Sequence, residues 1–313
     1  MTRHRRGRTV NGILVLDKPE GPTSNQALQS VKHLFEAAKA GHTGSLDPLA
    51  TGVLPICFGE ATKFTRFLLE ADKAYKATFR LGISTTTGDA QGAVVATRAA
   101  FGLTEVAVEA AMAELRGVIA QIPSMYSALK QGGRPLYELA RQGIEVERPP
   151  REVRIDEFRI EAFRAGEYPE LDVLIRCSKG TYIRTLAEDL GRALGCGAHV
   201  TRLRRVASGP FGEASAVSLA HLRSLRDSAP ASELDRLLQP ADAAVADRHP
   251  LELTDSLSWY FLRGQPVTVP ELPAASIGEG DLVRVFCAAG EFLGLGEVLE
   301  DRRIKPHRLV RSA

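Results

Sequence analysis

The 313-residue chain contains few cysteines, few aromatic side chains and no long hydrophobic run. Its apolar runs, such as Ile13 to Leu16, are far shorter than the roughly 18 consecutive residues that predict a transmembrane helix. After the basic segment Met1 to Arg8, a short apolar stretch ends at charged Asp17 and Lys18, so no signal peptide is predicted. We therefore expect a protein without a membrane span, located in the cytoplasm.

Motifs for metals and common cofactors are also missing. The cysteines form no close pair typical of a zinc site or a disulfide framework, and the histidines show no metal-ligand spacing. No Walker, dinucleotide-binding or Gly-x-Ser-x-Gly motif occurs. The sequence therefore predicts neither a metal nor a cofactor. The four cysteines are Cys57, Cys177, Cys196 and Cys287.

The formal net charge is only +2 at pH 7, so attraction to a nucleic acid has to come from local clusters of basic residues. Three clusters are present, and each taken alone is also typical of a solvated protein surface. They comprise Arg3, Arg5, Arg6 and Arg8; Lys130, Arg134, Arg141, Arg148, Arg151 and Arg154; and Arg202, Arg204 and Arg205.

Residue patterns in the first part of the chain predict both strands and helices. Val10 to Leu16 is typical of a buried strand that ends before Pro19. Thr23 or Ser24 is expected to cap a helix with one apolar face. Tyr75 to Ile83 alternates between apolar and polar residues, which predicts a strand with one buried face.

The same alternation from Leu171 to Cys177 gives way to helical spacing from Ile183 to Leu194, so Lys179 to Arg184 lies at a strand-to-helix junction. Because strands and helices are mixed without a repeating strand–helix unit, we predict an α+β fold. Further helices are expected at Thr104 to Arg116, Pro135 to Gln142, Val217 to Leu225 and Glu233 to Leu238.

The composition changes between Ser208 and Pro250, where Ala, Ser, Asp and Pro become frequent. Beyond Leu251, strand-like pieces at Leu282 to Phe286 and Phe292 to Val298 are separated by glycine-rich turns, which is typical of a small β-rich module. We expect a basic N-terminal tail over residues 1–9, a main domain over residues 10–250 and the module over residues 251–313.

The segment Gly41 to Gly52, GHTGSLDPLATG, cannot form a regular helix and is expected to be an irregular, ordered loop. It carries one carboxylate, Asp47, which precedes Pro48 and is held away from helical geometry. From the residues alone two interpretations remain open. Asp47 is either a functional carboxylate in a loop that a substrate approaches closely, or part of a turn-forming Asp-Pro pair.

Six segments between Asn11 and Phe211 resemble, in order, the TruB family of tRNA pseudouridine-55 synthases of the bacterial type. A basic segment near the C-terminus, RRIKPHRLVR, fits the family less specifically. The six segments are GILVLDKPEGPTS, GHTGSLDPLATGVLP, KAYKATFRLGISTTTGD, PSMYSALKQGGRPLYELARQG, CSKGTYIRTLAEDLG and GAHVTRLRRVASGPF.

This resemblance implies the pseudouridine synthase fold, an α+β domain around a mixed sheet, followed by a small C-terminal β-rich, PUA-like module. It implies an isomerase that needs no cofactor. The bond from C1′ to N1 of a uracil is cut, the base turns, and C5 is joined to C1′. It further implies that residues 124–154, approximately, form an insertion that clamps the T-arm of tRNA.

Roles for individual residues also follow from the resemblance. Asp47 matches the essential aspartate of the family, whose role is attack on the sugar, attack on the base, or proton abstraction from the sugar. Arg184 matches the arginine that pairs with this aspartate, which would keep it ionised and fix its direction. Tyr75 matches a tyrosine that stacks on the target base and assists proton removal, although its place on a strand also suits core packing.

Other matched positions belong to substrate binding. Tyr182 and Leu203 correspond to residues that line the uracil pocket, and His42 to one that occupies space around the flipped nucleotide. Lys18 belongs to a pair with Pro19 that shapes the pocket floor, and we also place it among residues contacting RNA. The further expected RNA contacts are Lys130, Arg134, Arg141 and Arg202.

We expect the T-arm of tRNA as the partner, no protein partner, and a monomer. The main alternative is a noncatalytic protein that binds or remodels tRNA. A carboxylate such as Asp47 argues against it, because a pure binder gains nothing from a negative charge beside RNA phosphates. A second alternative, hydrolysis of a base–sugar bond, would change the RNA mass, whereas isomerisation would not.

Overall fold

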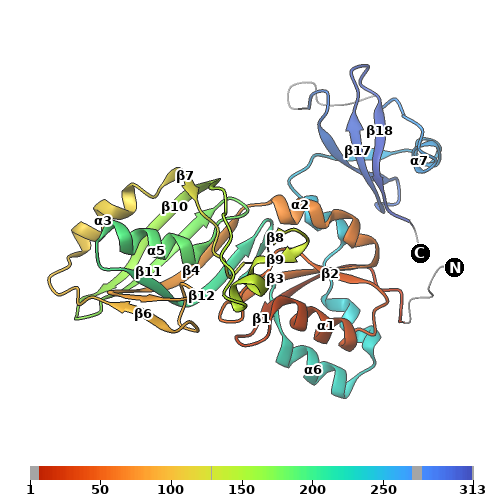
Figure 1. Ribbon diagram of the computed structural model, residues 1–313. Coiled ribbons are helices and arrows are strands. Elements are labelled where there is room, and N and C mark those ends of the chain that lie inside the picture. Colours follow the sequence, from red (N-terminus) through yellow and green to blue (C-terminus); the bar gives the residue numbers. More distant parts are fainter. Residues whose placement is uncertain (1–6, 128, 270–276, 312–313) are drawn as a thin grey trace.

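The computed structural model describes residues 7–127, 129–269 and 277–311 and divides them between a large α+β domain and a smaller β-rich module (Figure 1). Of the expected N-terminal tail, residues 1–6 lie outside the described residues, as do residue 128 of the insertion and residues 270–276 and 312–313 of the module. Arg8 is anchored on the large domain, because its guanidinium pairs with Asp235 at 2.5 Å. No helix in the described ranges is long and apolar enough to cross a membrane.

The large domain is built on a mixed sheet, which in the described part of the chain contains ten strands. β1 and β14 run parallel, as do β3 and β12, and the other neighbours are antiparallel. In spatial order the strands are β14 (Val217–Ser218), β1 (Gly12–Lys18), β3 (Thr51–Phe58), β12 (Ala198–Ser208), β4 (Lys73–Leu81), β11 (Glu170–Cys177), β10 (Arg151–Arg164) and β7 (Gly117–Gln121), with β2 (Ala40–His42) beside β3 and β13 (Phe211–Gly212) beside β12.

Four helices share one hydrophobic core with this sheet. Their apolar residues recur at helical spacing, as Ala27, Leu28 and Val31 do in the first helix, and these side chains are buried against the strands. The first helix begins at a capping box in which Thr23 and Gln26 exchange side-chain and backbone hydrogen bonds. The helices are α1 (Ser24–Leu34), α3 (Glu105–Ala113), α5 (Ile183–Ala193) and α6 (Leu219–Ser228).

The insertion consists of a small hairpin and a helix, which lie in front of the sheet in Figure 1. Strands β8 (Lys130–Gln131) and β9 (Arg134–Pro135) are joined by Gly132 and Gly133, both with positive φ, as a two-residue hairpin turn requires. The helix is α4 (Leu136–Arg141).

The other short elements of the large domain lie outside the insertion. They are β5 (Ile83–Thr85), β6 (Val94–Thr97), α2 (Thr65–Glu70) and the 3₁₀ turns η1 (Gly59–Phe64), η2 (Glu213–Ser215), η3 (Ala231–Leu237) and η4 (Ala241–Val245).

The C-terminal module contains a separate four-stranded sheet and one α-helix in its described residues. It is docked on the large domain: the Phe292 ring lies 5.4 Å from that of Phe64, and Lys63 Nζ donates to the Leu309 carbonyl at 2.8 Å. Phe292 and Leu295 of the module thereby join a hydrophobic cluster that includes η1, α2 and η4 and lies on the face of β1 and β3 opposite to α1. The elements are β15 (Pro250–Leu253), α7 (Asp255–Leu262), β16 (Leu282–Cys287), β17 (Phe292–Val298) and β18 (Ile304–Leu309).

The predicted α+β class, the mixed sheet and the β-rich C-terminal module are confirmed. The strand expected from Tyr75 to Ile83 ends at Leu81, because Gly82 adopts a φ of +87° and turns the chain into β5. The pattern at Glu233 to Leu238 forms a 3₁₀ turn and not an α-helix. Three strands that contribute much of the sheet, β3, β10 and β12, were not predicted from the sequence.

Candidate active site

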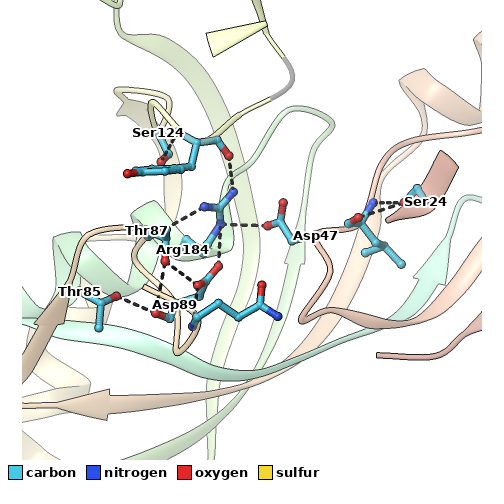
Figure 2. Close-up of polar contacts among 10 residues, drawn as sticks. Ser24, Asp47, Thr85, Thr87, Asp89, Ser124 and Arg184 are labelled. Atoms are coloured by element: carbon cyan, nitrogen blue, oxygen red, sulfur yellow. Dashed lines mark hydrogen bonds and ion pairs between the residues drawn. The ribbon is translucent and has the colours of Figure 1, made fainter. Parts of the chain in front are cut away.

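The loop that follows β2 is held by the first residue of α1, Ser24, and by the core. The Ser24 hydroxyl accepts from the Leu46 backbone N–H at 2.7 Å and donates to its carbonyl at 3.0 Å (Figure 2). Leu46, Leu49 and Ala50 are buried in the core. Because both sides of the aspartate are anchored, the loop presents one carboxylate in a fixed direction.

Lys18 is one of the anchors of this loop. Its ammonium donates to the carbonyls of Pro19, Pro48 and Ala50 at 3.0, 3.5 and 2.7 Å, and the residue is 0% exposed. Burial lowers the pKa of Lys18 to about 8. The expectation that Lys18 contacts RNA is therefore wrong for this structure, because its donors are used inside the protein, whereas a role under the pocket agrees with its position.

Arg184, near the start of α5, forms an ion pair with Asp47 in which Nε and Oδ2 are 2.9 Å apart. Its other donors reach two backbone carbonyls, those of Thr87 and Tyr126, each at 2.9 Å. Figure 2 shows the guanidinium at the centre of these contacts. Arg184 is buried, while the Asp47 side chain is 39% exposed, so the carboxylate is fixed by its partner and still accessible.

A second carboxylate, which sequence analysis missed, stands behind the arginine. Asp89 Oδ2 lies 3.8 Å from Arg184 Nε, and Asp89 is almost completely buried. Its other oxygen accepts from the Thr87 hydroxyl at 2.6 Å and from the Gln91 N–H at 3.0 Å. Asp89 is the last residue of the third quoted segment, KAYKATFRLGISTTTGD, but no role was predicted for it.

We expect Asp89→Asn to slow chemistry by about 100-fold with little change in RNA affinity, because small displacements of a catalytic group are costly. Asp89 acts as a positioning residue through Arg184. Its charge also raises the pKa of Asp47, so the acid limb of the rate profile should move to lower pH. Single-turnover rates across pH test this, with Asp172→Asn, an acid paired with Arg164, as the control. A parental rate and pH profile would contradict the role.

The surroundings of Asp47 act on its pKa in opposite directions. Burial raises the pKa, the Arg184 guanidinium lowers it, and the nearby Asp89 carboxylate raises it again. The net direction is upward from the ordinary value for aspartate. Arg184 therefore favours the ionised form, as predicted from sequence, but burial outweighs that effect.

Asp47 forms part of the wall of a cavity of about 290 Å³, close to the lower end of small-molecule sites. Tyr75, Tyr182 and Leu203, the residues predicted to surround a base, line this cavity together with Arg184. Burial raises the pKa of Tyr75, which keeps its phenol neutral and suits stacking better than action as a base. Tyr75 also belongs to the hydrophobic core, so the residue both lines the cavity and packs in the core.

Two cationic residues of this cavity were not predicted as site residues. Arg205 is 1% exposed and donates to the carbonyls of Val53 and Gly44 at 2.6 and 3.2 Å. A side chain at Gly52 would collide with the Arg205 carbonyl, with a Cβ only 2.2 Å away, so glycine permits this close strand pairing. Lys73 caps α2 by donating to the carbonyl of Leu69 at 2.7 Å. Arg205 belongs to the third basic cluster of the sequence, and Lys73 begins the third quoted segment, but neither residue was assigned to the site.

A second cavity of about 530 Å³ lies between the Asp47 loop and the insertion. It is lined by His42 on one side and by Tyr137 and Arg141 on the other, with Asp47 and Arg184 shared between the two cavities. Burial, and then the charge of Arg205, lower the pKa of His42, so the imidazole is neutral. The Nδ1 atom of His42 is buried and has no hydrogen-bond partner among the described residues.

The remaining predicted RNA contacts lie at the surface. Lys130 and Arg134 are exposed on the hairpin of the insertion and line neither of these two cavities. Arg202 is exposed on β12 beside a separate hollow that also includes Lys76. Its neighbour Arg204 is paired with Asp17 and Glu213, so the third basic cluster contains one exposed, one paired and one buried arginine.

The fold occurs in solved structures. The chain superposes with a TM-score of 0.71 on a chain from the "Crystal Structure of a Cbf5-Nop10-Gar1 Complex", at 26% identity, covering 96% of this chain and 84% of that one. The TM-score is 0.70 for the "archaeal box H/ACA sRNP Nop10-Cbf5 complex", at 26% identity and with 99% and 92% of the two chains covered.

Family models match most of the chain. Residues 32–183 match the "TruB family pseudouridylate synthase (N terminal domain)", residues 184–246 the "tRNA pseudouridylate synthase B C-terminal domain", and residues 250–310 "Pseudouridine synthase II TruB, C-terminal". Similar full-length relatives include the "tRNA pseudouridine synthase B" of Stutzerimonas stutzeri, 52% identical over 97% of both chains, and that of Saccharophagus degradans, 51% identical over 99% of both.

Fold and site thus define an isomerase of the pseudouridine synthase class, with an Asp–Arg pair at the wall of a small cavity. Within that class, the chain belongs to the TruB family of pseudouridylate synthases. The resemblance drawn from the six sequence segments is confirmed.

Proposed function

We propose that the protein isomerises the T-loop uridine of tRNA, position 55, to pseudouridine, and that Asp47 is the essential catalytic group. The single observation that carries the proposal is the Asp47 carboxylate, which is ion-paired to buried Arg184 and accessible from a cavity lined by Tyr75, Tyr182 and Leu203. Relatives about half identical over nearly the whole chain are named tRNA pseudouridine synthase B, which supports tRNA as the substrate.

The cavity suits a uracil that has left the RNA stack. Aromatic and apolar walls replace the stacking that a flipped base loses. In the reaction the C1′–N1 bond breaks and a C5–C1′ bond forms, the hydrogen on C5 leaves, and N1 takes up a proton, so atoms and electrons balance. Asp47 attacks the sugar, attacks the base or removes a proton from the sugar, and a carboxylate that is paired with Arg184 and accessible from the cavity is compatible with each route.

The insertion is proposed to hold the T-arm over the site. Arg141 lies above the Tyr137 ring at 5.5 Å and lines the cavity that opens on Asp47, so it approaches RNA close to the target nucleotide. Lys130 and Arg134 extend this basic surface along the hairpin. These cations attract RNA phosphates and so offset the repulsion between the phosphates and the two acidic residues of the site, Asp47 and Asp89.

Neutralising Lys130, Arg134 and Arg141 together to Gln should weaken tRNA binding and flatten its salt dependence by about one unit of slope for each lost phosphate contact. Chemistry on bound RNA should change less. Binding titrations over a range of salt concentrations measure the slope. The matched control is the Gln variant of Lys32, Arg223 and Arg236, which removes the same charge from α1, α6 and η3. If the two variants show the same dependence of tRNA affinity on salt concentration, Lys130, Arg134 and Arg141 are ordinary solvated surface residues.

The proposed function is tested by incubating unmodified tRNA with the purified protein and no additives, followed by chemical mapping of pseudouridine. Product at the T-loop uridine is the expected result. The alternative of a noncatalytic tRNA-binding or folding protein predicts a complex without product. Hydrolysis of the base–sugar bond predicts an abasic site and a loss of RNA mass, whereas isomerisation leaves the mass unchanged.

We further propose that the enzyme acts in the cytoplasm as a monomer without a protein partner. The support is that one chain supplies the Asp47–Arg184 pair and the residues described around both cavities. Sedimentation of the active protein with and without tRNA tests the stoichiometry. Activity confined to a dimer would contradict this part of the proposal.

A further inference from the structure

The helix of the C-terminal module exposes an aromatic surface that the catalytic site does not use. On α7, Trp259 is 51% exposed and Tyr260 is 44% exposed, and their rings meet edge to face at 4.9 Å. The opposite side of the same helix is buried through Phe261 in the core of the module. Trp259 and Tyr260 therefore leave much of their aromatic surface outside this core, and neighbouring exposed aromatic side chains of this kind are typical of an interaction site.

A guanidinium extends this surface. The Arg263 group lies 3.5 Å from the centre of the Trp259 ring, at stacking distance, and Arg263 also donates to the Trp259 carbonyl at 3.0 Å. The spacing of four residues places both side chains on one face of the helix. The guanidinium lies over one face of the indole and adds a positive charge to the exposed aromatic surface. Such a combination is typical of sites that stack unpaired nucleobases.

The neighbouring strand adds charge of the same sign. Strand β18 packs against α7, and its six residues, IKPHRL, include Lys305, His307 and Arg308 but no acid. Lys305 and Arg308 are exposed. An apolar protein partner would find few aliphatic side chains here, whereas a nucleotide would find a stacking surface next to cations for its phosphate.

We propose that Trp259, with Tyr260 and Arg263, stacks an unpaired nucleotide of the substrate RNA that lies outside the loop bound at Asp47. The inference rests on the proposed function, since it takes tRNA as the ligand. No described residue of the module lines either cavity at Asp47, and Figure 1 shows α7 at the edge of the module. The contact therefore concerns a different part of the RNA and adds affinity without taking part in chemistry.

The chain contains a single tryptophan, so its fluorescence reports on this surface alone. Full-length tRNA should quench the emission of Trp259 on binding, whereas a T-arm stem-loop should bind with little quenching. Free N-acetyltryptophanamide in the same RNA solutions corrects for absorption of light by the RNA. Equal quenching by both RNAs, or none by tRNA at saturation, would overturn the proposal.

Trp259→Ala should weaken full-length tRNA binding about 5- to 150-fold, the range for one lost base–aromatic stack, and should leave T-arm affinity and turnover unchanged. Trp259→Phe should restore part of the affinity. Leu262→Ala, on the same helix and 40% exposed, is the matched control and should have little effect. Equal losses of affinity for the Trp259 and Leu262 variants, or self-association that depends on Trp259, would indicate that this surface binds protein and not a nucleotide. Either result would overturn the proposal. Absence of pseudouridine in the T-arm with the parent enzyme would instead refute the proposed function.

Discussion

Asp47→Asn should reduce pseudouridine formation by at least about 10³-fold, to the background of the assay, while tRNA affinity remains close to that of the parent. The amide keeps the size and shape of the carboxylate, but it neither attacks carbon nor removes a proton. Affinity should rise slightly if it changes at all, because a negative charge beside RNA phosphates is lost.

Single-turnover assays with enzyme in excess separate binding from chemistry, so a slow step is not mistaken for weak affinity. Asp172→Asn, which removes an acid from the charged face of the sheet, controls for general effects of lost charge. If folded Asp47→Asn protein converts tRNA at a rate near that of the parent, the proposal of Asp47 as the catalytic group is wrong.

The parent enzyme should lose activity in acid at a pH above the ordinary titration range of aspartate. All three routes open to Asp47 need its ionised form, and its pKa is raised by burial despite Arg184. As the pH falls through this raised pKa, Asp47 takes up a proton and the rate declines. A single-turnover profile on prebound tRNA measures the acid limb; a limb at or below the ordinary aspartate range would contradict the raised pKa.

The second large effect is expected for Arg184→Gln. This change removes the cation between two carboxylates and leaves the Thr87 and Tyr126 carbonyls without their donor. Breaking a buried ion pair on one side costs about 3–5 kcal/mol of folding stability. Because Asp47 loses its orientation as well as its charge partner, we also expect the rate to fall by about 10³-fold or more.

The sign of the pH effect makes this prediction specific. Without Arg184, the pKa of Asp47 should rise further, since the guanidinium is the group that lowers it. An acid with a raised pKa in the folded state destabilises the protein as the pH rises through that pKa, because the unfolded chain ionises more readily. The Arg184→Gln variant should therefore be less destabilised in mild acid than at neutral pH, as measured by denaturant unfolding.

A double-mutant cycle checks the cause of the lost stability. Adding Asp47→Asn to Arg184→Gln should recover part of the stability, because one uncompensated charge is removed, but no activity. Glu188→Gln is a useful control, since Glu188 is also near Arg184 but accepts none of its described hydrogen bonds. Strictly additive stability losses would show that the Asp47–Arg184 pair contributes orientation alone.

Arginine suits position 184 because its planar guanidinium carries several N–H donors in fixed directions and so binds several acceptors at once. One guanidinium meets Asp47, Asp89 and two carbonyls from separate segments, so it joins the loop of Asp47, the turn after β5 and the start of the insertion. A lysine would present a single ammonium and could not span these directions. The fixed arrangement lowers the cost of orienting Asp47 when RNA binds.

Docking of the C-terminal module connects it to the same region. The module packs on Phe64 of η1, and α2 follows directly and ends beside the cavity at Leu69. Deleting the module would expose this apolar contact as well as remove the RNA contact proposed at Trp259. Substitutions at Trp259 are therefore a cleaner way to separate binding by the module from construction of the site.

Local patterns in the sequence were sufficient for the elements that carry the main site residues. Alternation placed Tyr75 on the buried face of a strand, and the change from alternation to helical spacing placed Arg184 at the start of a helix, because both depend on neighbouring residues. The glycine-rich loop around Asp47 was recognisable for the same reason. The α+β class followed from the order of these elements.

Residue patterns by themselves did not show which groups meet or which are buried. The Asp47–Arg184 pair was expected only from the family resemblance, and the position of Asp89 behind it was not expected at all. Asp47, Asp89 and Arg184 are far apart in sequence and come together through sheet pairing and the carbonyls of two loops, for which no residue pattern exists. The basic residues Lys18 and Arg205 looked in sequence like others at the surface. Packing places them inside, where backbone carbonyls satisfy their donors, and burial of a charge is a property of the folded surroundings and not of the residue itself.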